Sequence, residues 1–351
     1  MEADEMEQIA IIAGPVNIYW SSVIRMFAVA AAVCCFLALY LKKGKPFAAV
    51  AVLPAAGIAS LVFARLAHWY FRPDGYESLY TAMRLFAPGD FALMGVFAGC
   101  FLAALVVRIA RLTDNLPELL DCLCISGSWG IAVGRLASFF NTSGRGMIVR
   151  NDLGFPWVNA VVNPVSGVEE YRLAVFLLQA TAAGLIFAML LISYRAAEKR
   201  GMKKDGDASL IFLLCYGASQ VILDSTRYDS LYFHSNGFVS VVQVLGAVSI
   251  VFPMMVFGAR LVYAEGFQIR QLALWVPQVL CFGLAGYMEY YVQRHGNQAL
   301  YAYSVMTGAL LVLILLSLLT RRLAMMAEDR RRQQILQMEE QKGCVSWKGW
   351  K

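Results

Sequence analysis

The feature that most constrains this chain is a series of nine long apolar stretches separated by short polar segments. Most of them reach the length of about 20 residues with which an α-helix crosses the hydrocarbon core of a bilayer. They cover residues 18–41, 47–69, 91–109, 116–140, 173–194, 208–223, 238–257, 272–292 and 299–320. Because 59% of the 351 residues are hydrophobic and only 15% are charged, a soluble globule would lack polar surface. We therefore expect an all-α polytopic membrane protein with about nine transmembrane helices.

Two of the nine stretches are weaker than the others. Residues 116–140 are interrupted by three glycines and by Arg135, and residues 208–223 are short. Polar groups are costly against lipid, so a helix that contains them packs against other helices. We expect these two helices to face the protein interior.

The charges between the stretches predict how the helices are oriented. If the segment after the first stretch is cytoplasmic, the segments on that side hold 20 of the 30 Lys and Arg residues, as the positive-inside rule requires. Residues 1–17 carry four carboxylates and no cation, and we expect them outside. The predicted topology places the N-terminus outside and the C-terminus inside. The net charge of +6 then reflects orientation and does not indicate a nucleic acid partner.

The eight cysteines do not indicate a disulfide framework, because seven of them lie in apolar stretches as small buried side chains. Cys122 and Cys124 point to different faces of an expected helix, which disfavours a metal site. The acidic N-terminus lacks the basic start and cleavage site of a signal peptide. We expect insertion through the chain's own helices and no metal.

Three arginines lie within or at the edge of the apolar stretches: Arg25, Arg65 and Arg135. The first two are near the outer ends of their helices, where a long side chain can extend to the headgroups. Arg135 differs because the surrounding segment, residues 134–146, is dense in small and polar residues. Glycines allow a ligand close to the backbone, and an arginine binds phosphate through two parallel hydrogen bonds. We therefore expect Arg135 to bind a lipid phosphate.

Two further cations follow Arg135. Arg145 and Arg150 are expected to be exposed in the external loop, with a place at the entrance for the lipid headgroup as the alternative.

A second polar cluster lies at the outer end of the sixth stretch. Tyr216, Gln220, Asp224 and Arg227 are spaced by four, four and three residues, so they share one helix face. A polar face on a membrane helix points away from lipid. Asp224 and Arg227 form either a plain ion pair or a pair that orients Arg135 or a substrate.

The order of residues within 134–146 points to a family. Gly134, Arg135, Phe139, Asn141 and Gly146 stand in an order that resembles the signature of the bacterial prolipoprotein diacylglyceryl transferases. The later series from Tyr216-Gly217 through an acidic residue to Arg227 is also similar to one in that family, and so is the position of Asp121. The resemblance covers about residues 15–262.

The resemblance implies how the chain is divided. Residues 18–262 would form a seven-span transferase-like core after an external N-terminus of residues 1–17. Residues 263–320 would add two transmembrane helices, and residues 321–351 a basic cytoplasmic tail.

It also implies an activity. Enzymes of this family are multi-pass proteins of the bacterial plasma membrane. They move diacylglyceryl from phosphatidylglycerol to the cysteine thiol of a prolipoprotein signal peptide in lipoprotein biosynthesis, and they release glycerol phosphate. The implied partners are phosphatidylglycerol, that cysteine and membrane lipids, and the displacement requires no cofactor.

The roles implied for this chain fall on two sets of residues. The expected catalytic residues are Arg135, Asp224 and Tyr216. The expected substrate-binding residues are Arg135, Asn141, Gly146, Ser138, Arg227 and Gln220.

The chain departs from the family pattern at several positions. The replacements are Met94 for a histidine, Ser138 for an asparagine, Ser143 and Gln179 for glutamates, and Gln220 for an arginine. Two alternatives to the transferase therefore stand. One is a catalytically inactive relative that binds lipid or a partner, and the other is a transporter of an anionic lipid or solute. The absence of a convincing inverted repeat disfavours the transporter.

Overall fold

The computed structural model describes residues 9–13, 16–43, 45–73, 76–83, 91–141, 143–149, 154–162, 167–233, 236–295 and 298–348. Arg150 lies outside these residues. The chain forms two compact units, Met1–Ala247 and Val248–Lys351. The division between them falls within one helix, α9 (Val241–Glu265), so the expected core of residues 18–262 stays a prediction.

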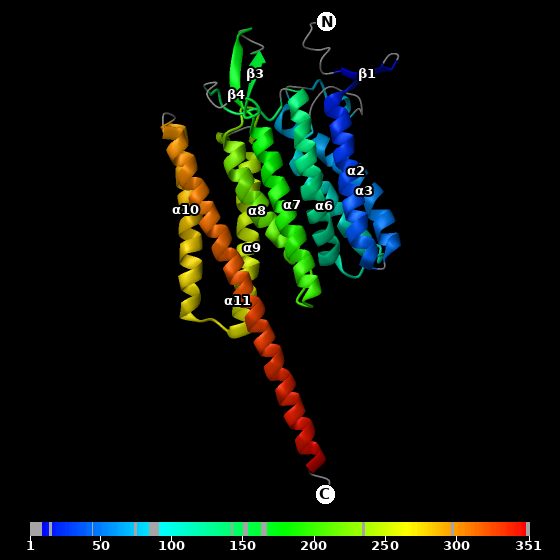
Figure 1. The fold of residues 1–351 in the computed structure, drawn as a ribbon, viewed down its shortest axis with the longest axis vertical. Coiled ribbons are helices and arrows are strands. Elements are labelled where there is room, and N and C mark those ends of the chain that lie inside the picture. The colour runs from blue at the N-terminus through cyan, green and yellow to red at the C-terminus, as the bar shows by residue number, and fades with distance from the viewer. Residues whose placement is uncertain are drawn as a thin grey trace. The chain divides into compact units, whose positions relative to one another are not determined.

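Each of the nine apolar stretches contains a helix (Figure 1). In the first unit these are α2 (Trp20–Tyr40), α3 (Pro46–Phe71), α5 (Leu93–Ile109), α6 (Leu116–Arg135), α7 (Val175–Lys199), α8 (Asp207–Ser225) and the start of α9. The second unit holds the rest of α9, then α10 (Leu272–Arg294) and α11 (Ala299–Lys348). Short helical turns are η1 (Leu41–Lys43), α4 (Leu79–Met83), η3 (Leu136–Phe140) and η4 (Ile269–Gln271).

The helices are long and apolar enough for a bilayer. Within the part of the chain that the structure describes, eight helical segments pass on length and hydropathy. The ninth, α5, has 17 residues, which is the lower limit for a crossing. The expectation of an all-α polytopic membrane protein is confirmed. Its orientation, with the N-terminus outside, stays a prediction.

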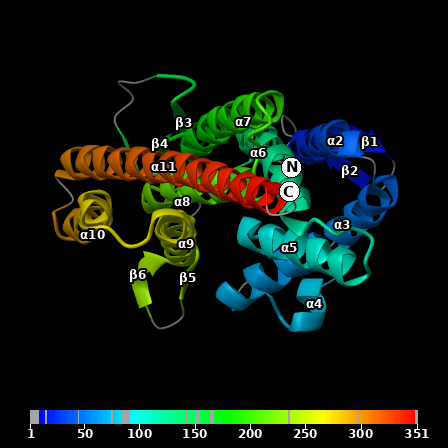
Figure 2. The same cartoon turned by 90° about the horizontal axis from the view of Figure 1, so that it is seen from below.

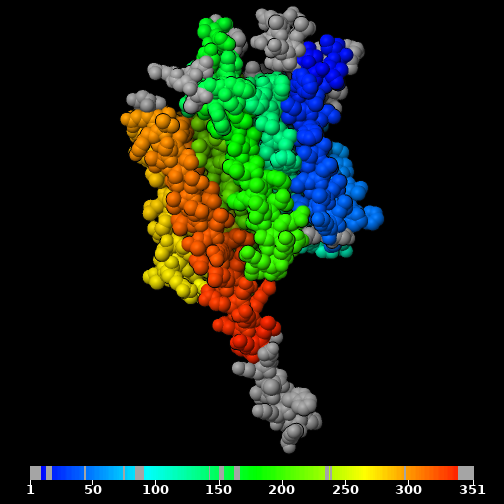
Figure 3. Space-filling model, viewed as in Figure 1, coloured from blue at the N-terminus to red at the C-terminus, as the bar shows by residue number. Residues whose placement is uncertain are grey.

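The outward side chains of the first unit fit this environment. Large apolar residues such as Phe27 on α2, Ile58 on α3 and Ile192 on α7 are about two-thirds exposed. Figure 3 shows α2 and α7 at the surface of that unit. Lipid would cover such side chains, since a bilayer accepts an apolar exterior.

Short hairpins accompany the helices of the first unit. They pair β1 (Ile9–Ala13) with β2 (Val16–Tyr19), β3 (Val158–Val162) with β4 (Glu169–Leu173), and β5 (Tyr232–Phe233) with β6 (Asn236–Ser240). Strands β1, β3 and β4 lie at one end of that unit's helices (Figure 1).

One hairpin positions the segment after η3. Gly146 N–H donates to the Leu173 carbonyl at 2.8 Å, and Leu173 N–H donates to the Met147 carbonyl at 3.1 Å. These bonds add residues 146–149 to the edge of β4. Because Leu173 leads directly into α7, they also place this segment beside the start of that helix.

Glycines on α5 allow an unusually close approach to α3. The two helices pack along each other (Figure 2). A Cβ atom at Gly95 would lie 2.5 Å from Ala64 Cα, and one at Gly99 would lie 2.5 Å from Ser60 Cα. Small residues are the usual means by which membrane helices approach this closely.

At the other end of the unit, a buried carboxylate fastens α6 to α8. Asp121 is fully buried. Its oxygens accept the backbone N–H groups of Gly206 and Ser209, both at 2.8 Å, and the Ser209 hydroxyl at 2.6 Å. The side chain therefore satisfies free N–H groups at the start of α8 from a neighbouring helix.

The second unit is held together by polar contacts inside apolar helices. Gln278 on α10 donates to the Thr320 hydroxyl of α11 at 3.0 Å and accepts from Ser317 at 3.4 Å. Further along, Arg330 of α11 pairs with Glu265 at 2.8 Å. Helix α11 therefore continues past residue 320, with partners as far as Arg331.

The close α3–α5 contact yields a prediction. Gly99→Leu should push the helices apart and destabilise the protein by about 1–3 kcal/mol, the usual cost of overpacking. The measurement is the thermal unfolding midpoint of purified protein in detergent.

Gly57→Leu on α3 is the matched control, because nothing lies within 4 Å of a Cβ atom at Gly57. Equal midpoints for the two variants would show that the close approach is not needed for stability.

Candidate functional site

The structure brings together side chains from the two polar clusters that the sequence singled out. On α8, Tyr216, Gln220 and Asp224 follow one another at four-residue spacing, and all three are buried. The α8 face therefore points into the protein, as its spacing predicts.

Arg135 meets this face from α6. Its guanidinium lies close enough to the Tyr216 hydroxyl for a favourable electrostatic interaction. It also lies within electrostatic range of Asp224 and Arg227. Four of the expected site residues thus form one cluster, although they come from segments about 80 to 90 residues apart in the sequence.

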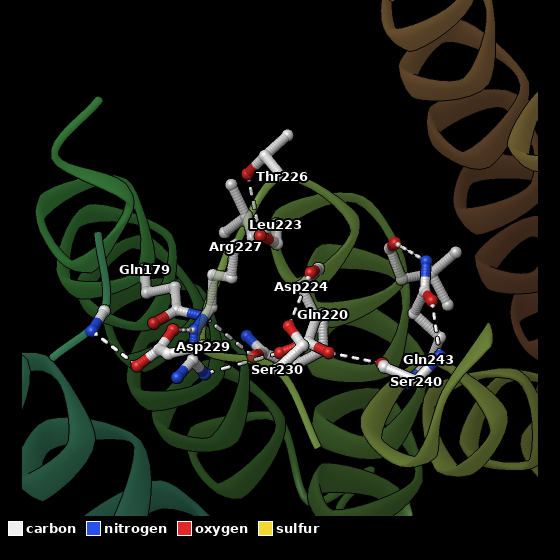
Figure 4. Close-up of polar contacts among 12 residues, drawn as sticks. Gln179, Gln220, Leu223, Asp224, Thr226, Arg227, Asp229, Ser230, Ser240 and Gln243 are labelled. Atoms are coloured by element: carbon white, nitrogen blue, oxygen red, sulfur yellow. Dashed lines mark hydrogen bonds and ion pairs between the residues drawn. The ribbon is translucent and has the colours of Figure 1, made fainter. Parts of the chain in front are cut away.

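Arg227 lies between two carboxylates (Figure 4). Its Nη1 is 3.3 Å from Asp224 Oδ1, and its Nε is 2.9 Å from Asp229 Oδ1. The ion pair of Asp224 with Arg227, which both readings of the sequence contain, is present, and its role in orienting Arg135 or a substrate stays a prediction. Asp229 was missed, because only the fold shows that the chain turns back after α8.

Asp229 also holds the segment after Arg135. Its Oδ2 accepts the backbone N–H of Gly144 at 2.9 Å. Gly144 has φ +73°, a conformation that glycine adopts without strain. A backbone bridge between Gly146 and Arg227 adds a second connection. The 134–146 segment is therefore fastened to the end of α8.

The charge state of Asp229 follows from its partners. Burial by itself raises the pKa of this carboxyl. The Arg227 guanidinium and the Gly144 N–H lower it by more, and the pKa lies below the ordinary value of 3.8. Asp229 is therefore ionised at neutral pH and balances Arg227.

Asp224 is engaged on its other side as well. The Ser240 hydroxyl donates to Asp224 Oδ2, and Ser230 donates to the Asp224 carbonyl at 2.9 Å. Gln243 accepts the Ser240 N–H at 2.9 Å. Both carboxylate oxygens of Asp224 thus have partners within the protein.

Asn141, Ser138 and Gly146 shape the 134–146 segment. Asn141 Oδ1 accepts the N–H of Ser143 at 3.0 Å and its hydroxyl at 2.7 Å. The Ser138 hydroxyl is 3.4 Å from that of Ser143. A Cβ atom at Gly146 would lie 2.6 Å from Val175 Cγ2 and 3.1 Å from the Thr226 carbonyl. Among the described residues, neither the Asn141 nor the Ser138 side chain forms a hydrogen bond with Arg135.

Arg145 differs from the expectation. The sequence predicted an exposed loop cation, whereas the side chain is only 5% exposed. Its Nη2 donates to the carbonyls of Ser138 at 3.1 Å and Asn141 at 3.2 Å, and its guanidinium lies 4.7 Å from the centre of the Phe176 ring. The expectation was wrong because the Ser138 carbonyl within η3, the Asn141 carbonyl after it and an aromatic face draw the guanidinium inward. Burial lowers the pKa of Arg145.

Arg25 and Arg65 were both expected to extend to the headgroups, and the structure agrees with this for Arg25 only. Arg25 is exposed on α2, where a side chain extending to the headgroups is expected. Arg65 is only 4% exposed, so the same expectation was wrong for it. Its guanidinium lies 4.7 Å from the Phe91 ring centre and donates to the Tyr76 hydroxyl at 3.3 Å.

Two neutral amides lie beside the charged cluster. Gln179 on α7 donates to Gln220 Oε1 on α8 at 3.3 Å, and both residues are at least 96% buried. Figure 4 shows this pair next to Asp224 and Arg227. The contact connects two positions at which the sequence departs from the family pattern.

No group of three His, Cys, Asp or Glu side chains that could hold a metal ion occurs in the described ranges. The fold and the cluster together define a class: a multi-pass helical membrane protein with an arginine-rich polar site among its helices. A family model of prolipoprotein diacylglyceryl transferases matches residues 8–259. The chain belongs to this family.

Curated relatives agree with the family match. A phosphatidylglycerol–prolipoprotein diacylglyceryl transferase of Thermotoga maritima is 28% identical over 198 residues, 55% of this chain and 64% of that protein. One from Prochlorococcus marinus is 24% identical over 238 residues, 62% of this chain and 77% of that protein. One from Streptococcus pneumoniae is 28% identical over 240 residues, 66% of this chain and 86% of that protein. The match to the Thermotoga protein thus spans slightly under two-thirds of its length.

The double role of Asp229 yields a prediction. Asp229→Asn removes the negative charge opposite Arg227 and weakens the acceptor for Gly144. We expect a loss of about 1.5–3 kcal/mol of stability at neutral pH, the range for hydrogen bonds to charged groups. Thermal unfolding in detergent measures it. Asp114→Asn is the control, because Asp114 is 82% exposed in its pair with Lys45, and it should change the midpoint little.

The dependence of stability on pH gives a second test of the charge on Asp229. Because folding lowers the pKa of Asp229, its contribution is complete above the ordinary value of 3.8 and is lost as the pH falls below it. The difference between wild type and Asp229→Asn should therefore shrink in acid. A difference that stays constant from neutral pH to below pH 3.8 would contradict the assigned charge.

Proposed function

We propose that this protein transfers diacylglyceryl from phosphatidylglycerol to the cysteine thiol of a prolipoprotein signal peptide. In this reaction the thiol loses its proton, a sulfur–carbon bond forms, and the carbon–oxygen bond to phosphate breaks. Glycerol phosphate leaves, and the proton goes to it or to solvent. The observation that carries the proposal is Arg135. Among the described residues, this guanidinium has no carboxylate within ion-pair distance, and it is oriented by Tyr216.

The charges favour Arg135 as the phosphate-binding residue. Arg227 is already balanced by Asp224 and Asp229, so we assign it to positioning the site. Arg135 has its charge available for the departing phosphate. Electrostatic stabilisation of a leaving group is commonly one of the largest contributions to catalysis.

The remaining residues support this arrangement. Tyr216 orients Arg135, and Asp224 fixes Arg227 and Ser240. Because both Asp224 oxygens are engaged, we assign it to positioning rather than to accepting the thiol proton. Asn141, Ser138 and Gly146 shape the turn that follows Arg135, and Gln220 lines the cluster with Gln179.

The proposed setting is the bacterial plasma membrane, with phosphatidylglycerol and other membrane lipids around the helices. In the predicted topology the end of α6 that carries Arg135 lies at the outer leaflet. This is the side on which an exported signal peptide would present its cysteine.

The test is a transfer assay with phosphatidylglycerol and a lipobox peptide, in which mass spectrometry detects the thioether product. We expect product with wild type. Arg135→Ala should lower kcat/KM by about a hundredfold to a thousandfold, the loss typical for removal of one group that stabilises an oxyanion. Arg25→Ala is the control, since Arg25 is an exposed arginine on α2, and it should retain wild-type activity.

Three outcomes would each contradict the proposed activity or the role proposed for Arg135. If folded, lipid-loaded wild type formed no thioether, a catalytically inactive lipid-binding relative would be favoured. If Arg135→Ala kept full turnover, the chain would be a transferase whose phosphate site lies elsewhere. Solute uptake by proteoliposomes would instead favour a transporter.

A further inference from the structure

Arg145 has hydrogen-bonding capacity that the protein does not use. Its Nη2 is bonded to the carbonyls of Ser138 and Asn141. Its Nε and Nη1 are buried and have no hydrogen-bond partner among the described residues. A buried donor left unpaired is costly, and more so when it carries charge.

The charge of Arg145 is also unbalanced by nearby carboxylates. Of the four arginines on the segments around the site, Arg227 pairs with Asp224 and Asp229, and Arg172 pairs with Glu170 at 2.6 Å. In the described part of the chain, Arg135 and Arg145 have no carboxylate within 4 Å. Two positive charges are thus available where the segment after α6 meets the end of α8.

The surroundings of Arg145 hold its guanidinium in place. The two carbonyls fix Nη2, and the Phe176 ring covers one face of the planar group. The Tyr228 N–H donates to the Arg145 carbonyl at 3.3 Å, which ties the residue to the loop after α8. A guanidinium fixed in this way offers Nε and Nη1 with little further loss of side-chain freedom.

The charge and the unused atoms of Arg145 indicate the ligand class. The edge of an arginine that binds two oxygens in parallel consists of Nε and Nη2, and Nη2 of Arg145 already donates to two carbonyls. Nε and Nη1 lie on different edges, so each offers a single charged hydrogen bond to an oxyanion. We propose that Arg145 forms a second anion site, separate from Arg135, in which a phosphoryl oxygen accepts a hydrogen bond from Nε or Nη1. Its ligand is the phosphate of an intact lipid headgroup or of free glycerol phosphate. The choice of phosphate as ligand rests on the proposed function.

The test compares lipid selectivity in variants of the full chain. Native mass spectrometry of detergent-purified protein measures retention of phosphatidylglycerol against diacylglycerol, which has the same acyl chains and no phosphate. Arg145→Gln should reduce the preference for phosphatidylglycerol about tenfold or more, the range for a lost charged hydrogen bond. Arg145→Lys keeps the charge and should restore part of that preference.

Arg172→Gln is the matched control, because this arginine already has Glu170 as its partner. It should keep the wild-type preference. A merely structural role for Arg145 predicts a different result, namely lower retention of both lipids and an unchanged ratio. An unchanged ratio of phosphatidylglycerol to diacylglycerol in Arg145→Gln would therefore overturn the proposal.

A second arm distinguishes the sources of phosphate. If the site binds the released product, glycerol phosphate should raise the thermal midpoint of wild type but not that of Arg145→Gln. If the site binds the lipid headgroup, phosphatidylglycerol should raise the thermal midpoint of wild type but not that of Arg145→Gln, and glycerol phosphate should raise neither. A response to neither in wild type would overturn the proposal.

A structure of wild type with bound phosphatidylglycerol keeps the test decisive if Arg145→Gln does not fold. The expected result is a phosphoryl oxygen within about 3 Å of Nε or Nη1. Because both binding measurements are made without the transfer reaction, an inactive enzyme with Arg145-dependent phosphate binding would refute only the proposed function.

Discussion

The site depends on the pairing of Arg227 with two carboxylates. A single buried charge near a membrane is strongly unfavourable unless it has a partner. Asp224 and Asp229 provide that partner on both sides of Arg227, and Asp229 extends the contact to Gly144. This group of charges joins the end of α8 to the segment that follows α6. The position of Arg135 relative to Tyr216 depends on that connection.

The helices could be predicted from the sequence because bilayer thickness fixes the length of an apolar stretch. Part of the site could be predicted for a similar reason. Four-residue spacing places Tyr216, Gln220 and Asp224 on one helix face in any α-helix. The same spacing predicted Arg227 as the partner of Asp224. The partners from other segments could not be found in this way. Ser240 reaches Asp224, and Gly144 reaches Asp229, only because of how the chain folds around the end of α8.

Arg145 and Arg65 show why the burial of single cations was mispredicted. A cation in a polar loop or near a helix end normally extends to water. For both residues an aromatic ring, Phe176 or Phe91, offers a face to the guanidinium instead. Such rings are distant in the sequence or separated by a connecting segment, so local pattern does not reveal them.

The neutral residues that separate this chain from the family pattern are not independent of one another. Gln179 and Gln220 stand where the resemblance implies a glutamate and an arginine, and their side chains are hydrogen-bonded. Two neutral amides give these positions the same net charge as the glutamate and arginine that the resemblance implies. Replacement at only one of the two positions would instead leave a lone buried charge. The two departures therefore lie at positions that contact each other in this structure.

Helix α8 is held at both ends by carboxylates, and this fixes the direction of its polar face. Asp121 binds the N–H groups at its start, and Asp224 with Arg227 anchors its end. The two anchors are about 25 Å apart along the helix. A rotation of α8 by one residue, about 100°, would take Gln220 and Asp224 out of their contacts with Gln179, Arg227 and Ser240 and break both anchors together. The buried carboxylate remote from Arg135 thus helps to set the contact between Arg135 and Tyr216.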